Sequence, residues 1–285
     1  MPMSMRVAAI QLCSGTGPRA NLEPAAAALR EAASRGAALA VLPENFACYA
    51  GDYRAVAERD GEMLRQWASQ QARALGLWLV AGTLPLVQRP DGSAVPAPRV
   101  RAASLLFAPD GSEQARYDKL HLFDADVADA QGRYRESGHF EPGDRLRVAR
   151  AGELSVGMAV CYDLRFAALA RVLAERGAHL LVYPSAFTAV TGAAHWELLL
   201  RARAVESGCY VLGAGQCGAH DARRHSHGHS MLVDPWGTVV ASLGETPGVL
   251  VEDLDLARLE EIRHRLPVHQ HHRLITGLPD DITDN

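Results

Sequence analysis

Cys161 lies between an apolar segment, residues 154–160, and an amphipathic stretch, residues 162–173. A cysteine at the start of a helix meets unpaired backbone N–H groups and the positive end of the helix dipole, which favour the thiolate. The same N–H groups can bind an oxyanion after the sulfur attacks a carbonyl carbon. A buried structural cysteine is the alternative, so the prediction of a nucleophile depends on its companions.

Three charged residues upstream are candidates for the other groups that attack on a carbonyl needs. Glu44 follows the apolar segment 37–42, which predicts a buried strand. Lys119 follows a second strand-like segment, residues 113–117, and Glu136 lies in the connection after it. Because open α/β sheets place their ligands at the carboxyl ends of strands, these side chains are candidates for one site.

The family resemblance described below implies an unactivated amide as substrate, and the chemistry of such an amide assigns the roles. A thiol needs a neighbouring base, so we predict that Glu44 takes the proton of Cys161 and later returns it to the leaving nitrogen. The tetrahedral oxyanion needs a positive partner, which we predict to be Lys119 together with the backbone N–H of Tyr162. A thioester on Cys161 would follow, and Glu44 would activate the water that hydrolyses it.

Alternating strand and helix patterns surround these residues and predict one domain with mixed sheets and outer helices. A helix is expected after Asn21, as its N-cap, with Gly36 beyond its end. The connection 118–143 has no periodicity and is long, which is typical of a functional loop. Further helices are predicted at residues 58–75, 165–176 and 193–207. Strands are predicted at residues 6–11, 39–42, 77–83, 100–108, 113–117, 146–149, 154–160, 179–183, 210–215, 231–234, 238–243 and 249–254.

Four motifs in order, at residues 41–46, 117–124, 134–137 and around Cys161, resemble the nitrilase superfamily of carbon–nitrogen hydrolases. The resemblance runs from Arg6 to about Arg273, within a single domain of residues 1–285. It implies an α/β fold, the four-layer α-β-β-α sandwich of that family. It also implies that Glu136 positions the substrate and supports Lys119 and the base.

The same resemblance implies a homodimer or a higher homo-oligomer. The candidate interface segments are the helix after Cys161, the helix at residues 193–207 and the tail at residues 266–281. No cofactor and no metal are implied.

Motifs at residues 185–187, 191–204, 209–211, 215–218 and 228–237 are similar to one branch of the superfamily, the deaminated glutathione amidases and the omega-amidases. This implies hydrolysis of deaminated glutathione to 2-oxoglutarate and cysteinylglycine, or else of 2-oxoglutaramate. Arg165 and Thr191 are then expected to bind the keto-acid carboxylate, since an arginine fork suits a carboxylate. Thr191 is also a candidate helix N-cap. Arg223 or Arg224 is expected to meet a distal glycine carboxylate.

Composition narrows the partners. The 285 residues carry a net charge of −4, which gives no electrostatic footprint for nucleic acid. No apolar run approaches the length of a membrane span, and the beginning of the sequence lacks a signal-peptide core. Five cysteines without regular spacing favour a reducing compartment. We therefore expect a cytoplasmic protein whose partner is a small-molecule amide.

Two readings from other classes stay open. The first alternative is a metal-dependent hydrolase, since three histidines can hold zinc. The candidate ligands are the alternating histidines His225, His227 and His229 and a second cluster at His269, His271 and His272. A catalytically silent binding protein on the same fold is the other, because fold alone does not establish catalysis. The presence of all four candidate catalytic residues speaks against it.

Overall fold

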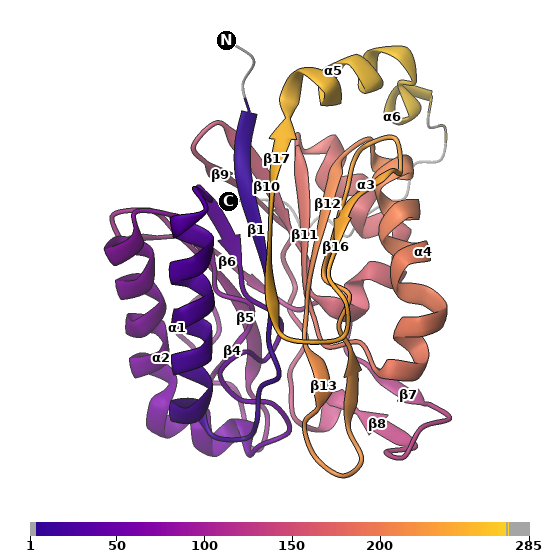
Figure 1. Cartoon of the computed structure of the whole chain (residues 1–285). Coiled ribbons are helices and arrows are strands. Elements are labelled where there is room, and N and C mark those ends of the chain that lie inside the picture. Colours follow the sequence, from indigo (N-terminus) through magenta and orange to yellow (C-terminus); the bar gives the residue numbers. More distant parts are fainter. Residues whose placement is uncertain (1–3, 272, 274–285) are drawn as a thin grey trace.

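The computed structural model describes residues 4–271 and 273. They form two β-sheets packed face to face, with two helices outside each sheet (Figure 1). Helices α1 (Pro18–Ser34) and α2 (Tyr53–Leu75) cover one sheet, and α3 (Ala167–Glu175) and α4 (Ala189–Ser207) cover the other. This is the predicted four-layer α-β-β-α sandwich of the nitrilase type.

The first sheet has the strand order β17-β1-β2-β3-β5-β4, and β6 also pairs with β5. Strands β1, β2 and β3 are parallel, whereas β17 and β5 pair in the antiparallel sense on either side of them. The bounds are β1 (Ser4–Gln11), β2 (Leu39–Val41), β3 (Trp78–Val80), β4 (Leu84–Leu86), β5 (Arg101–Phe107), β6 (Glu113–Asp118) and β17 (Gly248–Asp255).

The second sheet has the order β16-β15-β12-β11-β10-β9, again with three parallel strands, β10, β11 and β12, at its centre. Within each sheet, the carboxyl ends of the parallel strands therefore lie on the same edge. Glu44 and Cys161 come shortly after two of these strands. The bounds are β9 (Arg147–Ala151), β10 (Leu154–Met158), β11 (Leu180–Ser185), β12 (Tyr210–Gly215), β15 (Met231–Val233) and β16 (Val239–Ser242).

Strand β1 shows why both faces of the central strands are apolar. Val7 and Ala9 face the core between the two sheets, whereas Ala8 and Ile10 face the core under α1 and α2. All four side chains are fully buried. Strands covered on both faces appear in sequence as continuous apolar runs, which is the pattern that predicted them. The layered core fixes the strand ends that carry the site.

Helix boundaries differ from the predictions at their beginnings. Helix α1 begins at Pro18, so Asn21 lies inside it and is not the N-cap. The Asn21 amide instead donates hydrogen bonds to the carbonyls of Gly15 and Ala47, which joins two loops. Helix α2 begins earlier than predicted because Asp52 caps it by accepting a hydrogen bond from a backbone N–H.

The long connection after β6 is not structureless. It contains a short hairpin, β7 (Asp124–Asp126) and β8 (Arg133–Arg135), followed by the 3₁₀ turn η1 (Glu136–Gly138). A second hairpin, β13 (Cys217–Ala219) and β14 (His225–His227), follows β12. Both hairpins lie beyond the same end of the sandwich (Figure 1). The chain continues through α5 (Leu256–Arg265) and α6 (Val268–His271). From residue 274 onward the predicted interface tail lies outside the described residues.

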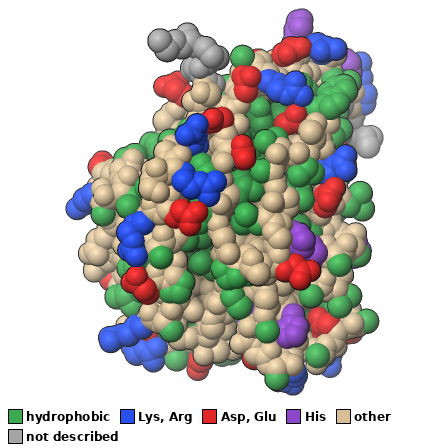
Figure 2. Space-filling model, in the orientation of Figure 1, with side chains coloured by type: hydrophobic (Ala, Val, Ile, Leu, Met, Phe, Trp, Pro, Cys, Tyr) green, Lys and Arg blue, Asp and Glu red, His purple; other side chains and the backbone are tan. Residues whose placement is uncertain are grey.

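The surface carries no dominant charge on the face drawn in Figure 2, where acidic and basic side chains intermingle. In the described part of the chain, no helix is both long and apolar enough to cross a membrane.

Candidate active site

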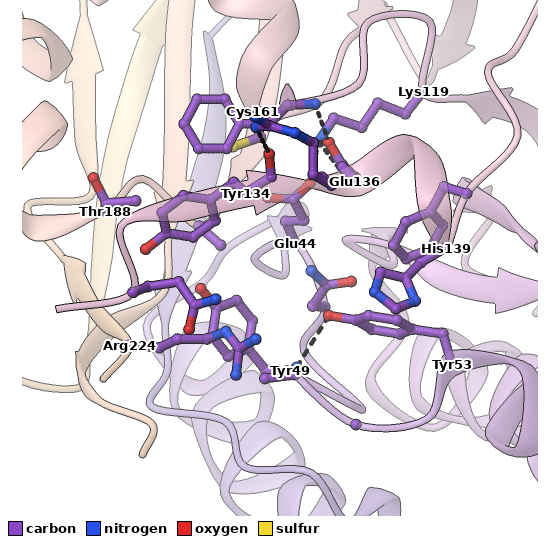
Figure 3. A pocket seen from close by; sticks show the side chains of 18 of the residues that line it. Glu44, Tyr49, Tyr53, Lys119, Tyr134, Glu136, His139, Cys161, Thr188 and Arg224 are labelled. Atoms are coloured by element: carbon purple, nitrogen blue, oxygen red, sulfur yellow. Dashed lines mark hydrogen bonds and ion pairs between the residues drawn. The ribbon is translucent and has the colours of Figure 1, made fainter. Parts of the chain in front are cut away.

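Four predicted residues converge in one cavity (Figure 3). Glu44 follows β2, Lys119 follows β6 and Cys161 follows β10, so three strand ends deliver three of the side chains. Glu136 arrives from the other direction, at the end of the β7–β8 hairpin. The cavity has a volume of about 350 Å³, and all four residues line it.

Lys119 lies between two carboxylates. Its Nζ atom is 2.8 Å from Oε1 of Glu44 and 2.7 Å and 2.8 Å from the two oxygens of Glu136. The residue is only 2% exposed. Burial opposes the charged form, but the Glu136 and Glu44 carboxylates outweigh it and raise the pKa of Lys119 well above its ordinary value. The ammonium charge is therefore permanent at neutral pH.

Glu136 is fixed by the base of its hairpin. Its Oε2 atom accepts a hydrogen bond from the backbone N–H of Phe123, and its own backbone N–H donates to the Phe123 carbonyl. Burial and then the nearby Glu44 raise the pKa of Glu136, although Lys119 opposes that shift. The Glu136 carboxylate thus contacts the Lys119 ammonium directly, and its positioning role stays a prediction.

Glu44 is held by its backbone. The side chain of Gln216 donates to the Glu44 carbonyl at 2.9 Å, which links the two sheets beside the cavity. The next residue, Asn45, has a left-handed backbone with φ of 56°. Its N–H donates to the Thr83 hydroxyl at 2.8 Å. This tight turn directs the carboxylate towards Lys119 and Cys161.

The surroundings of Cys161 differ from the prediction in one respect. Cys161 opens a short 3₁₀ turn, η2 (Cys161–Arg165), and helix α3 begins only at Ala167. The thiol is thus not at the N-terminus of an α-helix. Burial and then the Glu44 carboxylate raise the pKa of Cys161 well above its ordinary value. This shift opposes formation of the thiolate at neutral pH, so the sulfur needs a neighbouring base to act as a nucleophile.

Two backbone features distinguish the surroundings of the sulfur. Cys161 has a φ of 47°, a strained conformation for a residue with a side chain, as is frequent at functional sites. The backbone N–H of Ala186, which follows β11, forms a hydrogen bond with the Cys161 sulfur and lowers its pKa in part. The N–H of Tyr162 is adjacent in the chain. Sequence reasoning missed Ala186, because a backbone donor leaves no mark in residue type.

The predicted substrate-binding residues separate into two cavities. Arg165 and Thr191 both line a narrow cavity of about 20 Å³ on one side of Cys161, together with Tyr162. Arg224 lines the wide cavity, where Figure 3 shows it beside Tyr49. Arg223, the next residue in the chain, lines neither of the two.

Arg165 and Thr191 are each oriented by neighbours. The Arg165 guanidinium lies 5.7 Å from the ring centre of Tyr162 and 5.3 Å from that of Phe187, within the range of cation–π attraction. Thr191 is not the N-cap of α4. Thr188 is, and its hydroxyl oxygen accepts a hydrogen bond from the Thr191 N–H at 3.2 Å. The Thr191 hydroxyl lies 2.8 Å from the Thr188 hydroxyl, and both residues line the narrow cavity.

The described histidines of the two clusters form no metal-ligand arrangement, and His272 lies outside the described residues. In the part of the chain that the structure describes, no group of three or more His, Cys, Asp and Glu side chains could hold a metal ion. The His227 and His229 rings stack with their centres 4.4 Å apart. Burial, followed by the neighbouring His229, lowers the pKa of His227 to about 4, which indicates a neutral packed ring.

The use of lysine in this chain is a further sequence signal for the site. Lys119 is the only lysine in the sequence, whereas the other 28 of its 29 basic residues are arginines. A chain that uses arginine everywhere else keeps lysine at the one position where a compact ammonium fits between two carboxylates. An arginine fork suits planar partners and cannot replace a point charge in that space.

Comparisons with known proteins identify the family of this chain. The family model of carbon-nitrogen hydrolases matches residues 6–264. The deaminated glutathione amidase of Yersinia enterocolitica is 40% identical over 98% of this chain and 96% of its own length. The human omega-amidase NIT2 is 38% identical over 95% of each chain. The crystal structure of Nit3 from Saccharomyces cerevisiae, a member of the nitrilase superfamily, covers 93% of this chain and 95% of its own with a TM-score of 0.82 and 31% identity. The chain therefore belongs to the carbon–nitrogen hydrolase family, the nitrilase superfamily, and is an amidohydrolase.

Proposed function

We propose that this chain hydrolyses the amide of deaminated glutathione to 2-oxoglutarate and cysteinylglycine. One observation supports this choice most directly. The nucleophile Cys161 lines both a narrow cavity with Arg165 and a wide cavity with Arg224. A substrate with a carboxylate on each side of its scissile amide matches that arrangement.

Acylation begins at the thiol. Glu44 takes the proton of Cys161, and the sulfur attacks the amide carbon while the carbonyl π electrons move to oxygen. Lys119 and the Tyr162 N–H bind that oxyanion. Collapse of the intermediate breaks the C–N bond, and Glu44 returns the proton to the departing amine. The product that remains is a thioester on Cys161.

Deacylation uses the same groups in reverse order. Glu44 takes a proton from water, and the hydroxide attacks the thioester carbon. The second oxyanion again lies beside Lys119. The C–S bond then breaks, the sulfur regains its proton from Glu44, and the carboxylic acid leaves. Glu136 never touches the reacting atoms in this scheme, since it holds Lys119 in place.

Arg224 is suited to the leaving side. Its Nη1 atom donates to Asp221 at 2.9 Å, which orients the guanidinium and leaves its other nitrogens for a ligand. The backbone N–H groups of Arg223 and Arg224 lower the pKa of Asp221 to about 2, so this partner stays charged. We propose that Arg224 binds the carboxylate of the cysteinylglycine portion, and that Arg165 and Thr191 bind the keto-acid carboxylate.

The test compares two amides. Arg224→Gln should lower kcat/KM for deaminated glutathione by about 10- to 100-fold, because a charge-assisted hydrogen bond is worth about 1.5–3 kcal/mol. It should leave 2-oxoglutaramate unaffected, because ammonia carries no carboxylate into the wide cavity. Mass spectrometry of 2-oxoglutarate formation measures both reactions.

The adjacent arginine provides the matched control. Arg223→Gln removes the same charge from the same loop but from a side chain that lines neither cavity, so both reactions should remain at the wild-type rate. Equal loss in both variants would refute the role of Arg224. A wild-type preference for 2-oxoglutaramate would instead make the chain an omega-amidase, and turnover of neither amide would favour the silent binding protein.

We also propose a homodimer that forms through α4. This helix exposes apolar side chains on its outer face, Val190, Leu198 and Val205, of which Leu198 is 66% exposed. Trp236, 59% exposed, belongs to the turn whose Gly237 carbonyl accepts a hydrogen bond from Arg201 of α4. Several exposed apolar side chains on and beside one helix are typical of an interface.

Sedimentation velocity tests this interface. Leu198→Asp should shift the protein from dimer to monomer, because it places a carboxylate in an apolar contact. Met63→Asp is the control, since Met63 is an exposed apolar residue on α2, in the opposite outer layer. A monomeric wild type, or a Leu198→Asp variant that remains dimeric, would contradict the proposal. A cytoplasmic location belongs to the same proposal and is supported by five free thiols in the described residues.

A further inference from the structure

Asp163 is a buried carboxyl group that the mechanism leaves without a role. It lies two residues after Cys161 and is 0% exposed. Its Oδ2 atom accepts hydrogen bonds from the Tyr117 hydroxyl at 2.7 Å and from the Val160 N–H at 2.8 Å. Its Oδ1 atom accepts from the His121 N–H at 3.1 Å and lies 2.7 Å from the His121 Nδ1 atom. Since a carboxylate only accepts, that ring nitrogen carries the proton.

The partners of Asp163 come from the two segments that carry the chemistry. Val160 directly precedes Cys161. Tyr117 and His121 lie two residues before and two residues after Lys119. The Asp163 carboxyl group therefore connects the segment around Cys161, which follows β10 of the second sheet, to the segment around Lys119, which follows β6 of the first sheet.

The connection is stiff for two reasons. A buried carboxylate is costly unless donors satisfy it, and here both oxygens are satisfied, so any relative movement of the two loops breaks a buried hydrogen bond. Burial and then the Asp163 carboxylate raise the pKa of Tyr117 well above its ordinary value, so its hydroxyl remains a donor. The strained backbone of Cys161, with φ of 47°, also persists only where the surrounding contacts hold it in place.

We propose that Asp163 is a positioning residue that sets the Cys161 sulfur and the Lys119 ammonium at the separation needed to bind the oxyanion. The inference rests on the proposed roles of those two residues, but not on which amide is the substrate. Asp163 itself lines neither cavity and touches no reacting atom.

The experiment uses Asp163→Asn in the full-length protein. The asparagine amide keeps the shape of the aspartate side chain, but an NH₂ group replaces one acceptor oxygen. That NH₂ group then faces N–H or O–H donors and cannot accept their hydrogen bonds. Active sites are counted by alkylation with iodoacetamide and mass spectrometry of the Cys161 peptide, which separates it from the exposed thiol of Cys13, and kcat is expressed per titrated site. We expect kcat to fall about 100-fold, as for a misplaced reacting group, with KM unchanged.

Asp234→Asn is the matched control. Asp234 is also buried and accepts backbone hydrogen bonds, from Trp236 and Thr238, but it lines neither cavity. Its kcat per titrated site should equal that of the wild type even if its melting temperature falls. Tyr117→Phe removes a single donor to Asp163 and should lower kcat in the same direction by about 10-fold, so it decides the question if Asp163→Asn does not fold.

A second measurement separates positioning from a general structural defect. An aldehyde analogue of the 2-oxoglutaryl group forms a C–S bond with Cys161. Glu44 takes the thiol proton, and the carbonyl π electrons move to the oxygen beside Lys119. In Asp163→Asn, the inhibition constant of this analogue should increase by the same factor by which kcat falls. Wild-type kcat per titrated site and wild-type inhibition in Asp163→Asn, or in Tyr117→Phe where only that variant folds, would overturn the inference. If Cys161→Ala retained activity, the proposed function itself would fail, which is a different result.

Discussion

Replacement of Cys161 by alanine should abolish hydrolysis, with kcat reduced by at least about 10⁴-fold. No other described cysteine lines the wide or the narrow cavity, so no thiol can take its place. Substrate binding should survive, because Arg165, Thr191 and Arg224 remain. The measurement is 2-oxoglutarate release, accompanied by isothermal titration of the substrate into the inactive variant.

Two further readouts sharpen this prediction. Acid quenching of the wild type during turnover should trap an acyl adduct on the peptide that contains Cys161, and Cys161→Ala should show none. Cys209→Ala is the control, because Cys209 is fully buried and bonds the Ala178 carbonyl away from both cavities. Loss of activity in the Cys209 variant, or residual turnover near the wild-type rate in Cys161→Ala, would contradict the assignment of the nucleophile.

Lys119→Met should damage both catalysis and stability. The oxyanion loses its charged partner, so kcat should fall by about 10²- to 10³-fold. The carboxylates of Glu44 and Glu136 lose the cation between them, and breaking a buried ion pair by removal of one partner costs about 3–5 kcal/mol. Urea unfolding and the rate of product formation measure the two effects on the same preparation.

The pH dependence of Lys119→Met identifies the cause. Without the ammonium, burial and mutual repulsion raise a glutamate pKa in the folded state above its value in the unfolded chain. The folded state then binds the proton more tightly, so the stability deficit should be smaller at pH 5 than at pH 8. Lys119→Met with Glu136→Gln should recover part of the stability and none of the activity. A deficit independent of pH, or a double variant no more stable than Lys119→Met, would exclude carboxylate repulsion as its origin.

The sheets could be predicted from the sequence because both faces of their central strands are covered. In a four-layer sandwich, continuous apolar runs such as residues 6–11 and 154–160 form the central strands, which are buried on both faces. Helix beginnings were harder to predict. Asn21 has a residue type that caps helices, but its side chain serves the Gly15 and Ala47 carbonyls of neighbouring loops, a tertiary use that local sequence does not reveal.

The convergence of the candidate catalytic residues could be predicted in part for the same reason. Glu44, Lys119 and Cys161 each follow a strand-like segment, and strand ends of both sheets meet at one edge. Glu136 lies in a connection without periodicity, so only the family resemblance indicated it. The hairpin that delivers it is held by the Phe123 contacts and not by a hydrophobic pattern.

The protonation state of Cys161 was beyond the sequence. A junction between strand and helix predicted a stabilised thiolate, but the 3₁₀ turn displaces the helix N-terminus, and burial beside Glu44 acts in the opposite direction. The difference between Arg223 and Arg224 was also invisible, because adjacent residues of one loop face different surroundings. Both outcomes depend on packing across elements that are distant in the chain.

The solitary lysine turns the active site into its own spectroscopic reporter. A protein grown with nitrogen-15 in the lysine side chain alone would give a single ammonium resonance, and that resonance would come from Lys119. Its shift and its exchange with water would follow the charge held between Glu44 and Glu136 through binding, acylation and release. An enzyme of this size can thus be observed at its reaction centre by magnetic resonance with no mutation and no attached probe.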